Sequence, residues 1–479
     1  MNKPIALAVT LVLAGATSAC AMLEPRLPEA QPSIAAEWPL PPTSASLPGT
    51  SPTVPVRTEG ATADIGWRDF FVDPKLEELI GRALANNRDL RVAVLNVERA
   101  QQLYRIQRAD RVPTVTATGA MERGRFVAGD NLPVTEQYTA QLGVTQFELD
   151  LFGRVRNLSE AALQRYFAQE EARRSAQLAL IAEVANVYLT LAADRDQMRL
   201  AEATLRTRDE ALELTRKRQE FGAVSALDVY QARTQSESAR ADLARYAGQV
   251  AQDLSSLNLL VGGPVEEALL PTGFDAQVTG LDALPPGLPS EVLLRRPDVQ
   301  QAEHLLRAAN ADIGAARAAF FPSITLTGTV GYQSNDLSNL FDGGTGVWSF
   351  IPQVSLPIFE GGRLRANLGV ARVDRDVALA QYEQSIQQGF REVSDALALT
   401  STLAAQRTAI EDLVDAATRA EGLSIARYEA GRDSYLVRLE SQRTLYVAQQ
   451  TLISTRLAEQ TNRVNLYKVL GGGWEEHGR

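Results

Sequence analysis

Few side chains in this 479-residue sequence have the types and spacing needed for catalysis or metal binding. The two histidines, His304 and His477, have no partner at metal-ligand or nucleophile–base spacing, and we expect His304 to lie on a helix surface. No Gly-x-x-x-x-Gly-Lys-Ser/Thr sequence is present, and Gly471–Gly473 lacks the strand–turn–helix context of a phosphate loop. We expect these glycines to end the last helix. The sequence therefore predicts neither an enzyme nor a metal or organic cofactor.

The single cysteine, Cys20, directly follows a stretch with the pattern of an export signal. Lys3 supplies a positive start, residues 5–14 are apolar, and small residues precede the cysteine. The site is similar to the lipobox of bacterial lipoproteins, although Thr17 stands where leucine is usual; ordinary cleavage near Ala21 is the alternative. We predict a signal peptide over 1–19 and a covalent lipid on Cys20. Ala21, where a retention signal would have aspartate, favours the bacterial outer membrane.

The next segment, residues 20–63, is predicted to be a lipidated tether. Nine prolines lie between residues 24 and 60, so an extended chain is expected, with a reach on the order of 100 Å. Folded structure should begin near Trp67, with Asp73 and Pro74 opening a helix as cap and first residue. Beyond Ala21 we find no apolar window of about 20 residues, which predicts no membrane-spanning helix. The net charge of −10 argues against binding to nucleic acid.

An internal repeat with a constant offset of 209 residues organises the rest of the chain. Matching residues include Asp89 with Asp298, Arg108 with Arg317, Gly153 with Gly362, Gly222 with Gly431 and Leu257 with Leu466. We predict a first half over 64–262, a linker over 263–288, a second half over 289–474 and a tail over 475–479. Each half should contain a helix, a β-hairpin, a very long helix and another helix.

The long helices are predicted from residues 154–221 and 363–430, which contain no proline. At 1.5 Å per residue, each would extend about 100 Å. Apolar residues in the first recur at alternating spacings of three and four, as in Leu178, Ile181 and Ala185. These helices must therefore pack lengthwise against neighbours, as in a coiled coil.

Four intervening segments alternate with a period of two residues. Val115, Ala117 and Met121 alternate with threonines, and the same pattern recurs near residues 138–145, 324–332 and 348–356. One apolar and one Thr/Gln/Ser face over about ten residues is typical of a strand between lipid and water. Four strands cannot close in a membrane, since an open edge leaves backbone groups unpaired. Three copies would form a twelve-stranded barrel with a water-filled lumen.

These features together resemble the outer membrane factor family, the TolC-like ducts of tripartite efflux pumps, and its lipoprotein branch in particular. The resemblance covers residues 64–474 and depends on five motifs: Trp67–Phe71, Arg295–Val299, Phe321–Pro322, Leu356–Arg363 and Arg427–Gly431. It implies a mainly α protein with a transmembrane β-barrel portion, formed as a homotrimer with four strands per chain above an α-helical barrel. It also implies a passive efflux channel in the outer membrane, docked to a periplasmic adaptor and an inner-membrane RND-type transporter.

The glycine–serine pairs of the two halves predict tight turns between helices. Glycine suits the left-handed position that ends a helix, and serine caps the next one, with Asp228 three residues after Ser225. A purely structural turn is the simpler interpretation. The resemblance implies that these turns are the periplasmic tips that contact the adaptor, through Gly222, Ala223, Ser225, Gly431, Arg432 and Ser434.

Beyond the second turn, Leu436, Glu440 and Arg443 fall on one helical face. A solvated ion pair of little energetic value is the simpler interpretation of Glu440 and Arg443. The resemblance implies instead a closed periplasmic gate formed by Asp228, Leu436, Glu440 and Arg443. Three other functions stay open: a duct for type I protein secretion, a coiled-coil lipoprotein without a pore and, least favoured, a cell-wall hydrolase.

Overall fold

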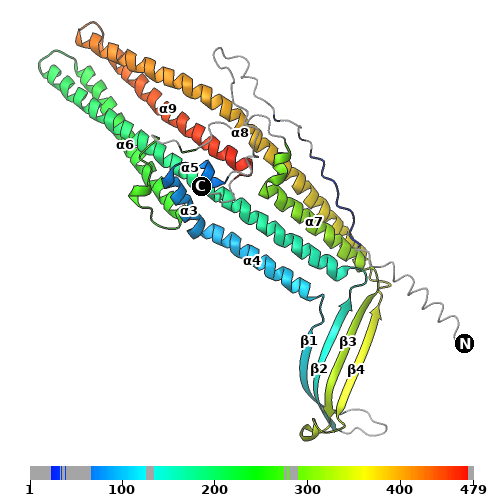
Figure 1. Cartoon of the computed structure of the whole chain (residues 1–479). Helices are drawn as coiled ribbons and strands as arrows, with labels where there is room; N and C mark the ends of the chain where they lie inside the picture. The colour runs from blue at the N-terminus through cyan, green and yellow to red at the C-terminus, as the bar shows by residue number, and fades with distance from the viewer. Residues whose placement is uncertain are drawn as a thin grey trace. The chain divides into compact units, whose positions relative to one another are not determined.

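The computed structural model describes residues 23–32, 34, 38, 66–125, 134–274, 278–279 and 290–472. The predicted signal, Cys20, most of the tether, part of the linker, His477 and the tail lie outside these residues. Figure 1 shows the order of the main elements. They are α2 (Trp67–Phe70), α3 (Pro74–Asn86), α4 (Arg88–Ala109), β1 (Val115–Arg125), β2 (Val134–Leu149), α5 (Arg154–Glu220), α6 (Ala226–Val261), α7 (Pro297–Ala318), β3 (Ser323–Ser334), β4 (Gly346–Ser355), α8 (Arg363–Glu429) and α9 (Tyr435–Val469). Short 3₁₀ turns are η3 (Glu267–Leu269), η4 (Ser290–Arg295) and η5 (Leu337–Asn339).

Corresponding elements of the two halves have nearly the same bounds. Helices α4 and α7 contain 22 residues each, and α5 and α8 contain 67 each. In both pairs, and in α6 with α9, the second helix begins 209 residues after the first. The long helices therefore lie where the absence of proline predicted them.

The chain divides into two compact units. One comprises Met1–Gln31, Leu95–Glu171 and Gln300–Gln384, and the other comprises Pro32–Val94, Ala172–Val299 and Ser385–Arg479. The first unit contains the sheet, in the antiparallel order β1-β2-β3-β4 (Figure 1). Its strands are the four alternating segments, so the period of two residues identified them correctly.

The strand register brings apolar residues of all four strands together on one face of the sheet. Ala117 pairs with Leu142, Leu142 with Val330, and Val330 with Trp348, forming one complete cross-strand row. The opposite face carries threonine and glutamine, since Thr118 pairs with Gln141. Leu142, Val330 and Trp348 are 54%, 62% and 79% exposed, so the described part of the chain leaves the apolar face uncovered.

A bulge in β2 changes the alternation. The register slips between Val144 and Phe147, and Gln146 has a positive φ of 53°. After the bulge, Phe147 pairs with Leu326, so odd-numbered residues of β2 replace even-numbered ones in the apolar rows. The Gln146 backbone N–H donates to Thr327 Oγ1 at 3.2 Å. Alternation alone predicts β2 only as far as Val144.

The described N-terminal segment is bound to the helices of the first unit. Arg317 donates to the Leu23 carbonyl at 3.1 Å, and Asn310 donates to Glu24 Oε1 at 2.9 Å and to the Pro25 carbonyl at 2.8 Å. Farther on, the Gln31 N–H donates to Glu383 Oε1 at 3.0 Å. Residues 23–31 thus have no regular secondary structure and are bound along these helices, while the reach of the whole tether stays a prediction. Proline prevents regular structure there, but backbone carbonyls still accept from α7.

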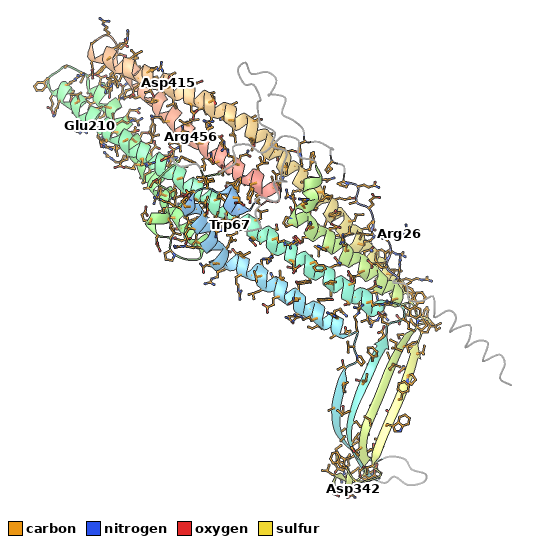
Figure 2. The ribbon with its side chains drawn as sticks, viewed as in Figure 1. Arg26, Trp67, Glu210, Asp342, Asp415 and Arg456 are labelled. Atoms are coloured by element: carbon orange, nitrogen blue, oxygen red, sulfur yellow. The ribbon has the colours of Figure 1, made fainter. Side chains whose placement is uncertain are left out.

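The second unit has a core of aromatic and aliphatic side chains. The Phe70 and Tyr467 rings stack with centroids 3.9 Å apart, and Tyr188 donates to Asp73 Oδ2 at 2.7 Å. Asp73 also caps α3 by accepting from the Lys75 N–H, as the Asp73–Pro74 sequence predicted. Figure 2 labels Trp67 in this region, where it is 1% exposed.

One stretch of α5 is apolar enough to cross a membrane. It has a mean hydropathy of 1.5, and 61% of it is buried within the protein. The sequence-based statement that no such window occurs was therefore wrong. Ile181, Val184 and Leu189 from this helix belong to the core of the second unit. Burial against neighbouring helices accounts for the apolar composition without a lipid contact.

Candidate gate and partner-contact site

Two helical hairpins, α5–α6 and α8–α9, end in turns of the same geometry. Gly222 and Gly431 have φ values of 71° and 69°, in the left-handed region that glycine adopts without strain. The Ala223 N–H donates to the Arg218 carbonyl at 2.8 Å, and the Arg432 N–H donates to the Arg427 carbonyl at 2.9 Å. These are the six-to-one bonds of a Schellman motif. The predicted turns are thus present at the predicted residues.

The two turns differ in how the next helix begins. Ser225 forms a capping box with Asp228: Ser225 Oγ accepts from the Asp228 N–H at 3.3 Å, and Asp228 Oδ2 accepts from the Ser225 N–H at 2.9 Å. Ser434 precedes α9 with an extended backbone but forms no side-chain cap hydrogen bond. Val437 stands three residues after Ser434 and cannot complete a box. The expectation that Ser434 caps α9 through its side chain was therefore wrong.

The predicted gate residues are exposed within a single chain. Leu436 is 62% exposed. Arg443 donates to Glu440 Oε1 at 2.9 Å, and the side chains of Arg443 and Glu440 are 63% and 59% exposed. Asp228 binds Ser225 in the capping box instead of contacting this pair. Among the described residues, the Glu440–Arg443 pair is thus exposed to solvent, as is Leu436.

A small apolar cluster joins the two hairpins just behind the turns. It consists of Leu212, Ala232, Tyr435 and Leu439, with Val229 and Tyr428 packed against it. The Tyr428 ring has its centroid 5.6 Å from that of Tyr435 and receives the Arg218 and Arg438 guanidinium groups at 5.7 and 5.4 Å. Tyr428 belongs to the Arg427–Gly431 motif, but neither it nor Tyr435 was predicted from the sequence to be a site residue. Their positions immediately beside the two ends of the second turn could have identified them.

An ion pair is specific to the second turn. Arg427 binds Asp433 through two hydrogen bonds of 2.7 and 2.9 Å. These bonds lower the pKa of the Asp433 carboxyl from its ordinary value. The matching arginine of the first half, Arg218, instead donates to the Tyr428 hydroxyl at 3.3 Å. The second turn therefore carries a fixed charge pair beside its predicted contact residues, Gly431 and Arg432.

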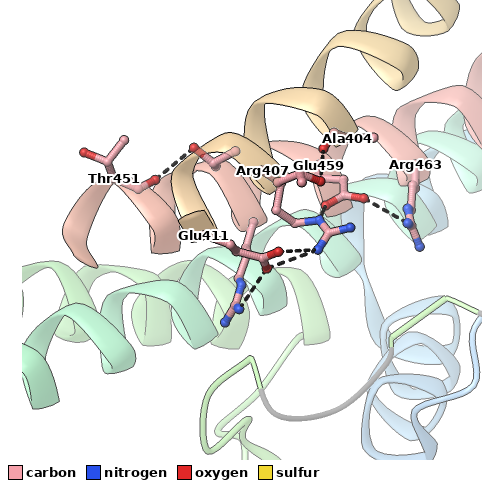
Figure 3. Close-up of polar contacts among 9 residues, drawn as sticks. Ala404, Arg407, Glu411, Thr451, Glu459 and Arg463 are labelled. Carbon is pink, nitrogen blue, oxygen red and sulfur yellow. Dashed lines mark hydrogen bonds and ion pairs between the residues drawn. The ribbon is translucent and has the colours of Figure 1, made fainter. Parts of the chain in front are cut away.

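Farther along the second hairpin, five charged residues form a continuous ionic ladder between α8 and α9 (Figure 3). Arg407 pairs with Glu459 at 2.9 Å and with Glu411 at 3.1 Å. Arg456 pairs with Glu411 at 3.2 Å, and Arg463 pairs with Glu459 at 3.0 Å. Glu459 is the most buried member, at 8% exposure. Each carboxylate is thus shared between two arginines.

The chemistry-bearing residues of the first unit form no reactive site in the described part of the chain. His304 Nδ1 lies 2.8 Å from Gln164 Oε1, and its ring lies 5.4 Å from that of Phe167. Burial lowers the pKa of His304. His304 therefore lies on the side of α7 that faces α5 and is half-buried there; the sequence predicted a position on a helix surface. No group of three or more metal-binding side chains occurs among the described residues.

Comparisons with known proteins give this geometry a family. The sequence profile of the outer membrane efflux protein family matches residues 79–263 and again residues 288–472. The toluene efflux pump outer membrane protein TtgC of Pseudomonas putida is 49% identical over 477 residues, which are 98% of this chain and 96% of that protein. The outer membrane protein OprJ of Pseudomonas aeruginosa is 42% identical over 481 residues, covering 99% and 98%.

Solved structures agree with this assignment. The open state of the MtrE outer membrane channel of Neisseria gonorrhoeae superposes with a TM-score of 0.84 at 38% identity, covering 95% of this chain and 99% of that one. The CmeC outer membrane channel of Campylobacter jejuni gives 0.84 at 25% identity, covering 96% of each. The chain therefore belongs to the outer membrane efflux protein family, whose members are channels and not enzymes.

Proposed function

We propose that this protein is the outer-membrane duct of a tripartite efflux pump, which passively conducts small toxic compounds out of the cell. The observation that carries the proposal is the open sheet with one exposed apolar face and one polar face. Such a sheet is suited to lie between lipid and an aqueous lumen. The family membership supports the same function, since TtgC is named as part of a toluene efflux pump.

The duct is proposed to be a homotrimer. Strands β1 and β4 are the two edges of the sheet, and an unpaired edge in hydrocarbon costs several kcal/mol per backbone group. Pairing β4 of one copy with β1 of the next would close a twelve-stranded barrel. The equal helix lengths and matched bounds further support two halves derived from one repeated unit. Cross-linking between edge strands should give a covalent trimer, and a purely dimeric product would contradict the assembly.

The hairpin turns are proposed as the contacts for a periplasmic adaptor, which in turn binds an inner-membrane RND-type transporter. Gly222, Gly431 and Arg432 are exposed in the turns, and a rigid Schellman geometry offers a fixed surface. The export signal, the lipid on Cys20 and the outer-membrane location are parts of the same proposal. Labelled palmitate should appear in the parent protein and be absent from Cys20→Ser.

The gate is proposed to open like an iris when the adaptor separates the hairpins. In the closed state, Leu436 and Glu440 would form an apolar and an acidic ring around the axis, each repeated in every copy, and opening would separate them. Leu436→Ala or Glu440→Ala should increase the closed-state conductance in planar bilayers severalfold. Val447→Ala is the matched control, because Val447 is a 52% exposed apolar residue farther along the same helix. Unchanged leakage in both gate variants would remove these residues from the gate.

Two alternatives remain to be separated by experiment. A duct for type I protein secretion would have the same architecture, and a pull-down of the cognate transporter would distinguish an RND protein from a secretion ATPase. A coiled-coil lipoprotein without a pore would show no conductance and no heat-modifiable migration. Conductance in planar bilayers therefore tests the proposed function directly.

A further inference from the structure

The apolar face of the sheet contains a hollow of about 670 Å³ that no protein group of the described chain fills. Its walls include side chains from all four strands and Phe341 of the β3–β4 connection. Figure 2 labels Asp342, the neighbour of Phe341, at the end of the sheet where β3 connects to β4. The hollow lies on a face and not along an edge, so pairing of edge strands between copies would leave it open.

The hollow results from the residue sizes in two adjacent cross-strand rows. One row joins Gly119, Ala140, Tyr332 and Gly346, three of which are small. The row beside it joins Ala117, Leu142, Val330 and Trp348. The large side chains thus stand as walls around a floor of small ones. Phe341 extends the wall, with its ring edge-on to Tyr332 at a centroid distance of 5.4 Å.

The position of the hollow along the strands determines what could occupy it. Toward the β1–β2 connection, the apolar positions of β1 end at Arg123, which forms an ion pair with Glu136 at 3.1 Å. Gly119 lies four residues from Arg123, which at 3.4 Å per residue is about 14 Å. If Arg123 and Glu136 mark the polar boundary of a membrane, the hollow lies in the hydrocarbon region. Headgroups would not reach it, and an acyl chain would.

We propose that this hollow binds one acyl chain of an outer-membrane phospholipid as a fixed site, distinct from the exchanging lipid around the sheet. The proposal depends on the proposed membrane location of the sheet. Lipid is the occupant because the hollow is continuous with an exposed apolar face that has no other neighbour in a closed barrel. Tyr332, Phe341 and Trp348 would restrict the chain to one path, which favours slow exchange.

The glycines of the sheet provide a matched pair of variants. A Cβ atom added at Gly119 would meet no atom within 4 Å, so Gly119→Leu should fill the hollow without displacing the backbone. Gly328 lies on the same apolar face outside the hollow, and its added Cβ would make only ordinary contacts of 3.8 Å with Phe350 and the Ser349 carbonyl. Gly328→Leu is therefore the control. Ala140→Leu fills the floor from β2 and serves if Gly119→Leu does not fold.

The test uses the full-length protein reconstituted in vesicles of phosphatidylethanolamine with dibrominated acyl chains and then extracted into mild detergent. Bromine quenches tryptophan at contact, and subtracting the emission of Trp348→Phe isolates Trp348. We expect Trp348 emission at least twofold below that from unbrominated vesicles, with one phospholipid per chain by native mass spectrometry. Gly119→Leu should lose both signals, and Gly328→Leu should keep them.

A parent protein that emerges without lipid, or equal lipid retention in Gly119→Leu and the parent, would overturn the proposal. Planar-bilayer conductance of the same preparations separates it from the duct itself. Conducting protein without retained lipid would refute the acyl-chain site alone, and protein that never conducts would refute the proposed function.

Discussion

The α5–α6 and α8–α9 hairpins have matching bounds but carry different side chains at one set of matched positions. In the second hairpin, Arg456, Glu459 and Arg463 of α9 belong to the ionic ladder with α8. The residues 209 positions earlier, on α6, are Ala247, Val250 and Leu254. Val250 and Leu254 pack against the apolar core that includes α3 and α5. The same fold thus has apolar residues at these positions in the first hairpin and charged residues at the matching positions in the second.

This difference indicates which hairpin can move away from its neighbours at a lower cost in free energy. Apolar burial must be lost entirely when helices part, because water cannot replace it favourably. Charged groups regain hydration when they separate, so an ionic seam loses much less. We therefore expect the second hairpin, which carries Leu436, Glu440 and Arg443, to be the more easily displaced one. Three variants test this, beginning with the largest effect.

Leu189→Ala should strongly destabilise the first hairpin. Leu189 is fully buried, and truncating a buried leucine costs about 2–5 kcal/mol. Hydrogen exchange followed by mass spectrometry should show faster exchange in α5, in α6 and in the end of α9 that carries Val464 and Tyr467, with α8 much less affected. Leu413→Ala is the control, because Leu413 is 47% exposed on α8. Equal acceleration in both hairpins would mean that the apolar core supports them alike.

Glu459→Gln should loosen the second hairpin by a smaller amount. The change leaves Arg407 and Arg463 without their shared carboxylate, at a cost of about 1–3 kcal/mol because both arginines are partly hydrated. Exchange in α8 and α9 should accelerate, and the parent should show the same trend as NaCl is raised from low to high concentration. Glu202→Gln on α5 is the control, since it matches the ladder residue Glu411 but lies in the apolar hairpin. Insensitivity of α8 and α9 to both changes would contradict an ionic seam.

Asp253→Asn should stabilise the first hairpin slightly, in a pH-dependent manner. Burial and the neighbouring Asp194 carboxylate raise the pKa of Asp253 to about 6 from 3.8. The folded protein therefore holds this proton more tightly than the unfolded chain, and the stabilisation present below 3.8 is lost as the pH rises through about 6.

The free energy of unfolding of Asp253→Asn, measured from thermal melts, should accordingly exceed that of the parent at pH 7.5 by about 1 kcal/mol once partial exposure is discounted, and match it at pH 4. Asp415→Asn changes an exposed aspartate on α8 and should have no such pH dependence. A constant difference across the pH range would show that Asp253 and Asp194 do not share a proton.

The sequence was sufficient where one local pattern decides the structure. Period-two alternation located the strands, the absence of proline located the long helices, and Gly222 and Gly431 located the turns. It was insufficient where distant residues decide. The bulge at Gln146 depends on the pairing of β2 with β3. The ionic ladder joins residues about 50 positions apart, so no local periodicity reveals it.

The binding of Leu23 to Arg317 has a consequence for how the protein would be held in a membrane. Only two residues lie between Cys20 and Leu23, so the two Cα atoms are at most about 11 Å apart. A fatty acid on that cysteine would therefore be held close to the end of α7. Helix α7 ends at Ala318, five residues before β3 begins at Ser323. Such an anchor would do more than keep the protein at the membrane, because its short connection would limit how far the strands can move along the membrane normal.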